Sequence, residues 1–179
     1  MWILRHAFAI AVLPVTAAIL VPFWLCRRFD VRAAFPTAAS EWAGVSFAII
    51  LFLIGGTLFA STVYFFATRG RGTLAPWDPP AHLVVRGPYR FVRNPMISGV
   101  LLVIVAESLF LRSWLHAAWA AIFLLANILY IPSVEEPRLE KRFGEPYRTY
   151  KVHVPRFLPR FTPWNDGDGA SSAAPSNSA

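Results

Sequence analysis

Charge and cysteine are both scarce in this sequence. Only 15% of its 179 residues are charged, whereas soluble proteins carry about 25% charged residues. The single cysteine, Cys26, excludes an intrachain disulfide and a cysteine-based metal cluster, and no metal site is expected. The 17 Lys and Arg residues give a net charge of +7, but they flank apolar runs and form no dense basic patch. A nucleic-acid partner is therefore disfavoured, and anionic lipid headgroups are the expected partner of these charges.

Long uncharged runs dominate the sequence instead. A helix needs about 20 apolar residues to cross roughly 30 Å of hydrocarbon. Four segments meet or nearly meet this length, at 7–26, 42–68, 94–111 and 113–134. They predict an all-α membrane bundle of about four transmembrane helices, the last two forming a hairpin. The bulky end of the first run offers no small-residue cleavage site, which favours a retained helix over a signal peptide.

The distribution of Lys and Arg predicts the orientation of these helices. With four crossings, 13 of the 17 fall on the side of the N-terminus, the 69–93 loop and the tail. Because cytoplasmic loops carry the excess of positive charge, both termini are expected in the cytoplasm, with the helices in a membrane such as a bacterial inner membrane. The chain then divides into two N-terminal helices (1–68), a loop, hairpin and interfacial segment (69–162), and a disordered polar tail (163–179).

The loop before the third run ends in a pattern typical of a helix start. Gly87 and Pro88 indicate a turn. Pro95 fits the first helical turn, where its missing N–H costs nothing, and Asn94 then occupies the N-cap. The free N–H groups and positive dipole end of such a helix suit an anion or a carboxylate.

Two adjacent carboxylates stand at the end of the fourth run. Glu135 and Glu136 follow about twenty uncharged residues. A carboxylate buried there is costly unless it is paired, so we expect an Arg of the 69–93 loop or a cationic ligand beside it. Apolar residues then recur every fourth position from Leu139 to Tyr147, which predicts an interfacial helix interrupted near Gly144.

Together the two polar segments resemble a known family. Residues 83–95 read LVVRGPYRFVRNP, residues 135–156 read EEPRLEKRFGEPYRTYKVHVPR, and a hydrophobic hairpin separates them. This order is similar to that of the isoprenylcysteine carboxyl methyltransferase and phospholipid methyltransferase family, integral-membrane enzymes that use S-adenosylmethionine. The resemblance covers about residues 70–162.

The resemblance implies a cofactor site at the cytosolic membrane boundary. The residues that would bind S-adenosylmethionine are His82, Leu83, Val84, Tyr89, Asn94, Pro95, Met96, Ile97 and Glu135. Arg93, Asn94 and Glu135 would be the catalytic residues. A carboxylate in a low-dielectric pocket also attracts the sulfonium and ammonium groups of this cofactor, which agrees with the assignment of Glu135.

Departures from the family pattern bear on the methyl acceptor. Asn94 stands where the family has a His, and Ile97 stands where it has a Tyr. Ile131 replaces the Arg with which the prenylcysteine enzymes hold the substrate carboxylate. The resemblance therefore implies a lipid-like or small hydrophobic acceptor that enters from the bilayer.

Two other functions fit parts of the same pattern. A membrane reductase of the steroid-reductase type resembles this group in its C-terminal half but uses a nicotinamide cofactor. A non-enzymatic membrane protein would use the basic C-terminal segment as an ordinary amphipathic helix on lipid. Substitution of Glu135 separates the methyltransferase, which should lose cofactor binding, from the non-enzymatic protein.

Glu107 is an ionisable group inside the third run. Such a residue is a functional hypothesis by default. The simpler interpretation is an ion pair with Arg112, five residues further on, at the far boundary of the membrane.

Overall fold

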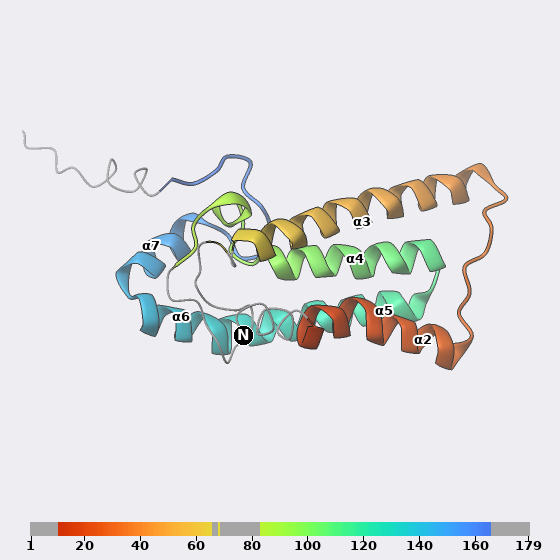
Figure 1. Cartoon of the computed structure of the whole chain (residues 1–179), viewed down its shortest axis with the longest axis horizontal. Coiled ribbons are helices and arrows are strands. Elements are labelled where there is room, and N and C mark those ends of the chain that lie inside the picture. Colours follow the sequence, from red (N-terminus) through yellow and green to blue (C-terminus); the bar gives the residue numbers. More distant parts are fainter. Residues whose placement is uncertain (1–10, 66–67, 69–82, 166–179) are drawn as a thin grey trace, which may run out of the picture.

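The computed structural model describes residues 11–65, 68 and 83–165, and the regular elements of this part of the chain are helices, with no strand among them (Figure 1). The predicted all-α class is confirmed for this part of the chain. In order, the elements are the π-helix η1 (Ala11–Leu20), α2 (Val21–Phe29), α3 (Ala39–Phe65), the 3-10 helix η3 (Gly87–Arg90), α4 (Pro95–Leu111), α5 (Trp114–Tyr130), the π-helix η4 (Ile131–Glu135), α6 (Glu136–Phe143) and α7 (Glu145–His153).

The long helices lie alongside one another (Figure 1). α3 packs along α4, α4 packs on α5, and η1 and α2 lie against α4 and α5. The other elements, η3, α6 and α7, gather at the end of the bundle where α4 begins. That end brings together the two polar segments that are separated in the sequence by the α4–α5 hairpin.

Two glycines allow α3 and α4 to touch backbone to backbone. A Cβ on Gly55 would lie 2.7 Å from the carbonyl oxygen of Gly99, and a Cβ on Gly99 would lie 2.8 Å from that of Gly55. Small residues permit this close approach between membrane helices. The contact holds together the two helices that lead to and from the 69–93 loop.

Two helical stretches are long and apolar enough to span a membrane, Ala39–Phe65 and Trp114–Phe143. The prediction of about four spans is therefore wrong for the described residues. α4 is apolar but has only 17 residues, fewer than the roughly 20 that a crossing needs. The expected span at 7–26 begins outside the described residues, and its described part is divided into η1 and α2, which contain Pro14 and Pro22 respectively. Leu20 at the junction keeps helical dihedral angles, φ −68° and ψ −45°, so the change from π to α geometry occurs without a break. A proline removes a backbone donor from a helix interior, which favours such a local change of geometry.

The second long stretch continues beyond the predicted end of the fourth run. α5, η4 and α6 form one apolar-to-polar helix, and Glu135 and Glu136 lie inside it instead of at its exit. The π-turn Ile131–Glu135 takes up Pro132 in its first turn. Single π-turns within α-helices are frequent at functional sites.

The C-terminal helix breaks where the sequence predicts. Gly144, with φ of +60°, separates α6 from α7. The predicted disordered tail begins too early, because Trp164 is only 1% exposed and packs against Tyr150 and Val154. A large aromatic side chain buries too much apolar surface to remain in a solvated tail. Residues 166–179 lie outside the described part of the chain.

Candidate functional site

Glu136 is the centre of an ion-pair cluster at the end of the bundle. It is 3% exposed, and Arg156 binds it through two contacts, Nε to Oε1 at 2.7 Å and Nη2 to Oε2 at 2.9 Å. Arg93 Nη1 lies 2.9 Å from Oε1, and Lys151 Nζ lies 3.6 Å from Oε2. The prediction that an Arg of the 69–93 loop pairs with one of the two carboxylates is confirmed for Arg93 and Glu136.

This cluster connects three separate parts of the chain. Arg93 precedes α4, Glu136 begins α6, and Arg156 follows α7. The two-point contact between Arg156 and Glu136 fixes orientation as well as distance, because guanidinium and carboxylate are both planar. Hydrogen bonding to Glu136 raises the pKa of Arg156, so this cation remains charged at all physiological pH values.

Arg93 retains donor capacity that the described residues do not use. Its side chain is 9% exposed, and its backbone N–H donates to the carbonyl oxygen of Pro155 at 2.9 Å. Its Nε is buried without a hydrogen-bond partner in the described part of the chain. Because an unmet buried donor costs about 1–3 kcal/mol, a ligand oxygen that reached Nε would recover that free energy.

Glu135 lies in a different environment from its neighbour. It is half-buried, and no cation of the described residues forms an ion pair with it. Burial raises the pKa of Tyr89, and the nearby Tyr150 and the negative charge of Glu135 raise it further. Glu135 is therefore a carboxylate that has no ion-pair partner among the described residues and whose charge acts on Tyr89.

Buried tyrosines line the same end of the bundle. Tyr150 donates from its hydroxyl to the carbonyl oxygen of Tyr89 at 2.7 Å. Burial is the main cause that raises the pKa of Tyr150, and it raises the pKa of Tyr147 to about 12. These phenols stay protonated at neutral pH, so they can donate hydrogen bonds but cannot act as bases.

The loop before α4 is held by the chain that follows α7. Arg160 N donates to Phe91 O at 2.9 Å, and Trp164 N donates to Arg90 O at 3.0 Å. On its other side the loop meets α3, where a Cβ on Gly87 would lie 2.2 Å from the ring of Phe65. With a φ of +56° as well, this position accepts only glycine.

Asn94 occupies the N-cap position of α4, as predicted, but its side chain does not cap the helix. The side-chain amide donates instead to the carbonyl oxygen of Arg156 at 3.3 Å. The expected role is therefore corrected: Asn94 ties the start of α4 to the segment that also supplies Arg156. The backbone carbonyl of Asn94 accepts from Ser98 N at 3.1 Å.

The other residues implied in cofactor binding are distributed around this end. Leu83 packs on the cluster formed by Tyr147, Tyr150, Val154 and Trp164. Val84 and Pro95 are buried, and Met96 and Ile97 are half-buried in the first turn of α4. His82 lies outside the described residues. The structure thus brings Leu83, Tyr89, Arg93 and Asn94 together with the segment after α7.

Three side chains that hold this region together were not singled out in the sequence. Arg156 and Lys151 bind Glu136, and Trp164 packs against the tyrosines. The adjacent carboxylates Glu135 and Glu136 indicate that cations lie nearby. Several Lys and Arg residues follow within about 25 positions, however, and the sequence does not distinguish Arg156 and Lys151 from the others. A tryptophan beside a polar tail was the available signal for Trp164.

A family model described as phospholipid methyltransferase matches residues 43–146, which is more than half of the 179-residue chain. The match runs from α3 into α7 and contains both Arg93 and Glu136. No curated protein and no solved structure gives a match. On the family match, this chain belongs to the phospholipid methyltransferase family.

Proposed function

We propose that this protein is an integral-membrane methyltransferase that uses S-adenosylmethionine and acts on a lipid-like or small hydrophobic acceptor. Family membership supports methyl transfer, and the two apolar helices support a membrane location. The observation that carries the proposal is the half-buried Glu135, which has no ion-pair partner among the described residues and is next in sequence to a carboxylate already paired with three cations.

The difference between the two carboxylates favours Glu135 as the cofactor ligand. Glu136 is neutralised by Arg93, Arg156 and Lys151, so it has little capacity left for another cation. Glu135 has no such partner in the described residues. A carboxylate at the membrane boundary stabilises a cation strongly because the local dielectric is low. The sulfonium and the ammonium of S-adenosylmethionine both fit that requirement.

The donors at the start of α4 suit the remaining charged group of the cofactor. The first N–H groups of this 17-residue helix have no intrahelical partner, and the unpartnered Nε of Arg93 is near in sequence. We assign both to the carboxylate of the cofactor, in the way that helix N-termini bind anions. In this proposal Asn94 positions the helix start through its bond to Arg156.

The chain contributes orientation and exclusion of water. S-adenosylmethionine supplies an activated methyl group when bound, so alignment of the acceptor accounts for much of the acceleration. An amine or hydroxyl acceptor must also lose a proton, and Glu135 is the available base because the neighbouring phenols stay neutral. Ile131, 1% exposed in η4, offers no positive charge to an acceptor carboxylate, which favours a hydrophobic acceptor.

Binding of S-adenosylhomocysteine tests the cofactor assignment. We expect calorimetry on the detergent-purified protein to give a binding isotherm, and Glu135→Gln to weaken binding at least tenfold, about 1.4 kcal/mol. Glu145→Gln is the matched control, because Glu145 is 76% exposed and, within the described part of the chain, its ion-pair partner is Arg148. Its affinity should equal that of the wild type.

Two results would contradict the proposal. One is no binding heat at high micromolar S-adenosylhomocysteine together with binding of a reduced nicotinamide cofactor. The other is an unchanged affinity in Glu135→Gln. Incubation of membranes with methyl-labelled S-adenosylmethionine then identifies the acceptor from the labelled product.

A further inference from the structure

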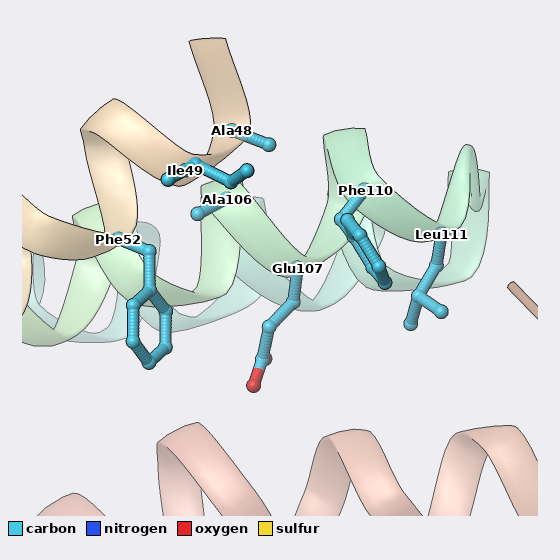
Figure 2. A pocket seen from close by; sticks show the side chains of 7 residues that line it. All are labelled: Ala48, Ile49, Phe52, Ala106, Glu107, Phe110 and Leu111. Atoms are coloured by element: carbon cyan, nitrogen blue, oxygen red, sulfur yellow. The ribbon is translucent and has the colours of Figure 1, made fainter. Parts of the chain in front are cut away.

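A pocket of about 260 Å³ opens between α3 and α4, toward the end of α4 and away from the proposed methyltransferase site (Figure 2). Its lining residues are Ala48, Ile49 and Phe52 of α3 and Ala106, Glu107, Phe110 and Leu111 of α4. The predicted ion pair of Glu107 with Arg112 is wrong, because Arg112 binds Glu41 instead. The pocket presents apolar side chains, as the rest of the two helices does, and the polar contacts of the chain gather at the other end of the bundle.

At that other end, the segment after α7 (residues 154–165) crosses the loop that precedes α4. Figure 1 shows this segment in blue beyond α7. Three backbone hydrogen bonds join the two: Arg93 N donates to Pro155 O at 2.9 Å, Arg160 N to Phe91 O at 2.9 Å, and Trp164 N to Arg90 O at 3.0 Å. These bonds satisfy backbone groups of a loop that has little regular structure of its own.

The two parts of this segment are attached in different ways. At its start, Arg156 holds Glu136 through two contacts. In the remaining part, residues 157–165, which we call the strap, Trp164 is the one buried side chain, at 1% exposed. Leu158 and Phe161 of the strap are 80% and 103% exposed. The strap is therefore held to the bundle by a single buried side chain together with its hydrogen bonds.

Trp164 packs where the proposed cofactor site lies. Its apolar cluster contains Tyr150, and Leu83 lies against that cluster. Tyr89 is 8% exposed and the side chain of Arg93 is 9% exposed. A molecule as large as S-adenosylmethionine can contact these residues only when part of the chain moves. A segment held by few buried contacts opens at a lower free-energy cost than the helices do.

We propose that the strap is a hinged latch, closed by the docking of Trp164, through which the cofactor enters and leaves its site. The hinge lies between Arg156, which stays bound to Glu136, and Arg160. Opening breaks the bonds that the amides of Arg160 and Trp164 donate to the loop. The passage of the cofactor rests on the proposed function, whereas the opening of the strap does not.

Amide hydrogen exchange on the full-length protein in detergent tests the opening without a cofactor. We expect the amides of Arg160 and Trp164 to exchange with a common opening free energy, and the amide of Arg93, on the fixed side of the hinge, to exchange more slowly. Trp164→Ala should speed exchange at Arg160 at least about a hundredfold and leave Arg93 within about threefold. Mass spectrometry with electron-transfer fragmentation resolves the individual amides.

Two further variants separate the docking of the ring from other effects. Trp164→Phe keeps an aromatic ring and loses no hydrogen bond, because the indole Nε1 has no partner within the described residues. Exchange at Arg160 should then stay within about tenfold of the wild type. Phe161→Ala changes a fully exposed side chain of the same strap, and its exchange should equal that of the wild type.

Rates of S-adenosylhomocysteine binding test the role of the strap at the site. When only the open form binds, the apparent association rate is the intrinsic rate multiplied by the open fraction. Trp164→Ala should therefore raise the association rate at least about tenfold and raise the dissociation rate as well. A strap that only supported the fold would give slower or unchanged association. Surface plasmon resonance on the immobilised protein measures both rates.

Two results would overturn the proposal. One is exchange at Arg160 that Trp164→Ala leaves unchanged or alters equally at Arg93, since the strap would then not open as a separate unit. The other is association of S-adenosylhomocysteine that is no faster in Trp164→Ala than in the wild type. Absence of binding by the wild type would instead contradict the proposed function, and hydrogen exchange would still decide whether the strap opens.

Discussion

Removing the charge of Glu136 should destabilise the end of the bundle that carries the proposed site. Glu136→Gln keeps the size of the side chain but leaves Arg93 and Arg156 without their shared carboxylate. Loss of one partner from a fully buried pair costs about 3–5 kcal/mol. Here Glu136 is 3% exposed, but Arg156 and Lys151 are 31% and 39% exposed, so water can solvate part of the released charge. We therefore expect a cost of about 2–3 kcal/mol, below the fully buried range.

A double-mutant cycle measures the pairwise part of this free energy. The variants are Glu136→Gln, Arg156→Gln and the double substitution, and unfolding is followed in detergent by circular dichroism during denaturant titration. Because the contact is two-pointed, with N–O distances of 2.7 and 2.9 Å, we expect a coupling free energy of at least about 1 kcal/mol. The cycle removes the separate effects of each substitution on the unfolded chain.

An exposed pair in the same region provides the control. Glu145 and Arg148 lie 3.3 Å apart with side chains 76% and 59% exposed, and such pairs couple by about 0.2–1 kcal/mol or less. If the Glu136–Arg156 coupling is no larger than that of this control, the ion-pair cluster does not hold the site together. Glu136 would then not be set apart from Glu135 by its ion pairs, and Glu135 would not be favoured as the cofactor ligand.

Three further predictions concern packing and pH. Gly55→Ala should destabilise the protein by about 1–3 kcal/mol, because its Cβ would meet the facing carbonyl oxygen of α4, whereas Gly56→Ala, with nothing within 4 Å, should be neutral or stabilising in thermal melts. Trp164→Ala should cost about 3–5 kcal/mol in denaturant titration, and the fully exposed Phe161→Ala almost nothing. The pKa of Tyr150 is raised mainly by burial, so the stability due to its protonated form is complete below about pH 10 and decreases above it. Tyr150→Phe should reduce this alkaline loss in melts recorded between about pH 8 and pH 11.

Local features of the fold were predictable from the sequence, and distant contacts were not. Pro95 predicted the start of α4, because a proline is free of penalty only in the first turn, and Gly144 predicted the break between α6 and α7. The number of spans was overestimated because the apolar character of 94–111 was clear but its helix is too short. Amino-acid composition predicts that a segment is apolar more reliably than it predicts where its helix ends.

The pairing at the candidate site shows the same limit. That Glu136 needs a cation follows from burial of a carboxylate, and Arg93 was among the predicted partners. Arg156 lies 20 residues from Glu136, and it reaches that carboxylate only because α7 turns back at Gly144. The sequence around Gly144 indicates a turn but not the direction in which α7 leaves it. The two-point contact between Arg156 and Glu136 could therefore not be predicted from the sequence.

The doubled carboxylate is best understood as a division of two tasks between neighbours in one helix. Successive residues of a helix project about 100° apart, so Glu135 and Glu136 cannot both face the same partners. Glu136 faces the cations of the loop and of the segment after α7, and by neutralising them it keeps the region compact. Glu135 is then left without an ion-pair partner among the residues that the structure describes. Exchanging these roles would need the helix to rotate by about a quarter turn, which the two-point contact of Glu136 with Arg156 opposes.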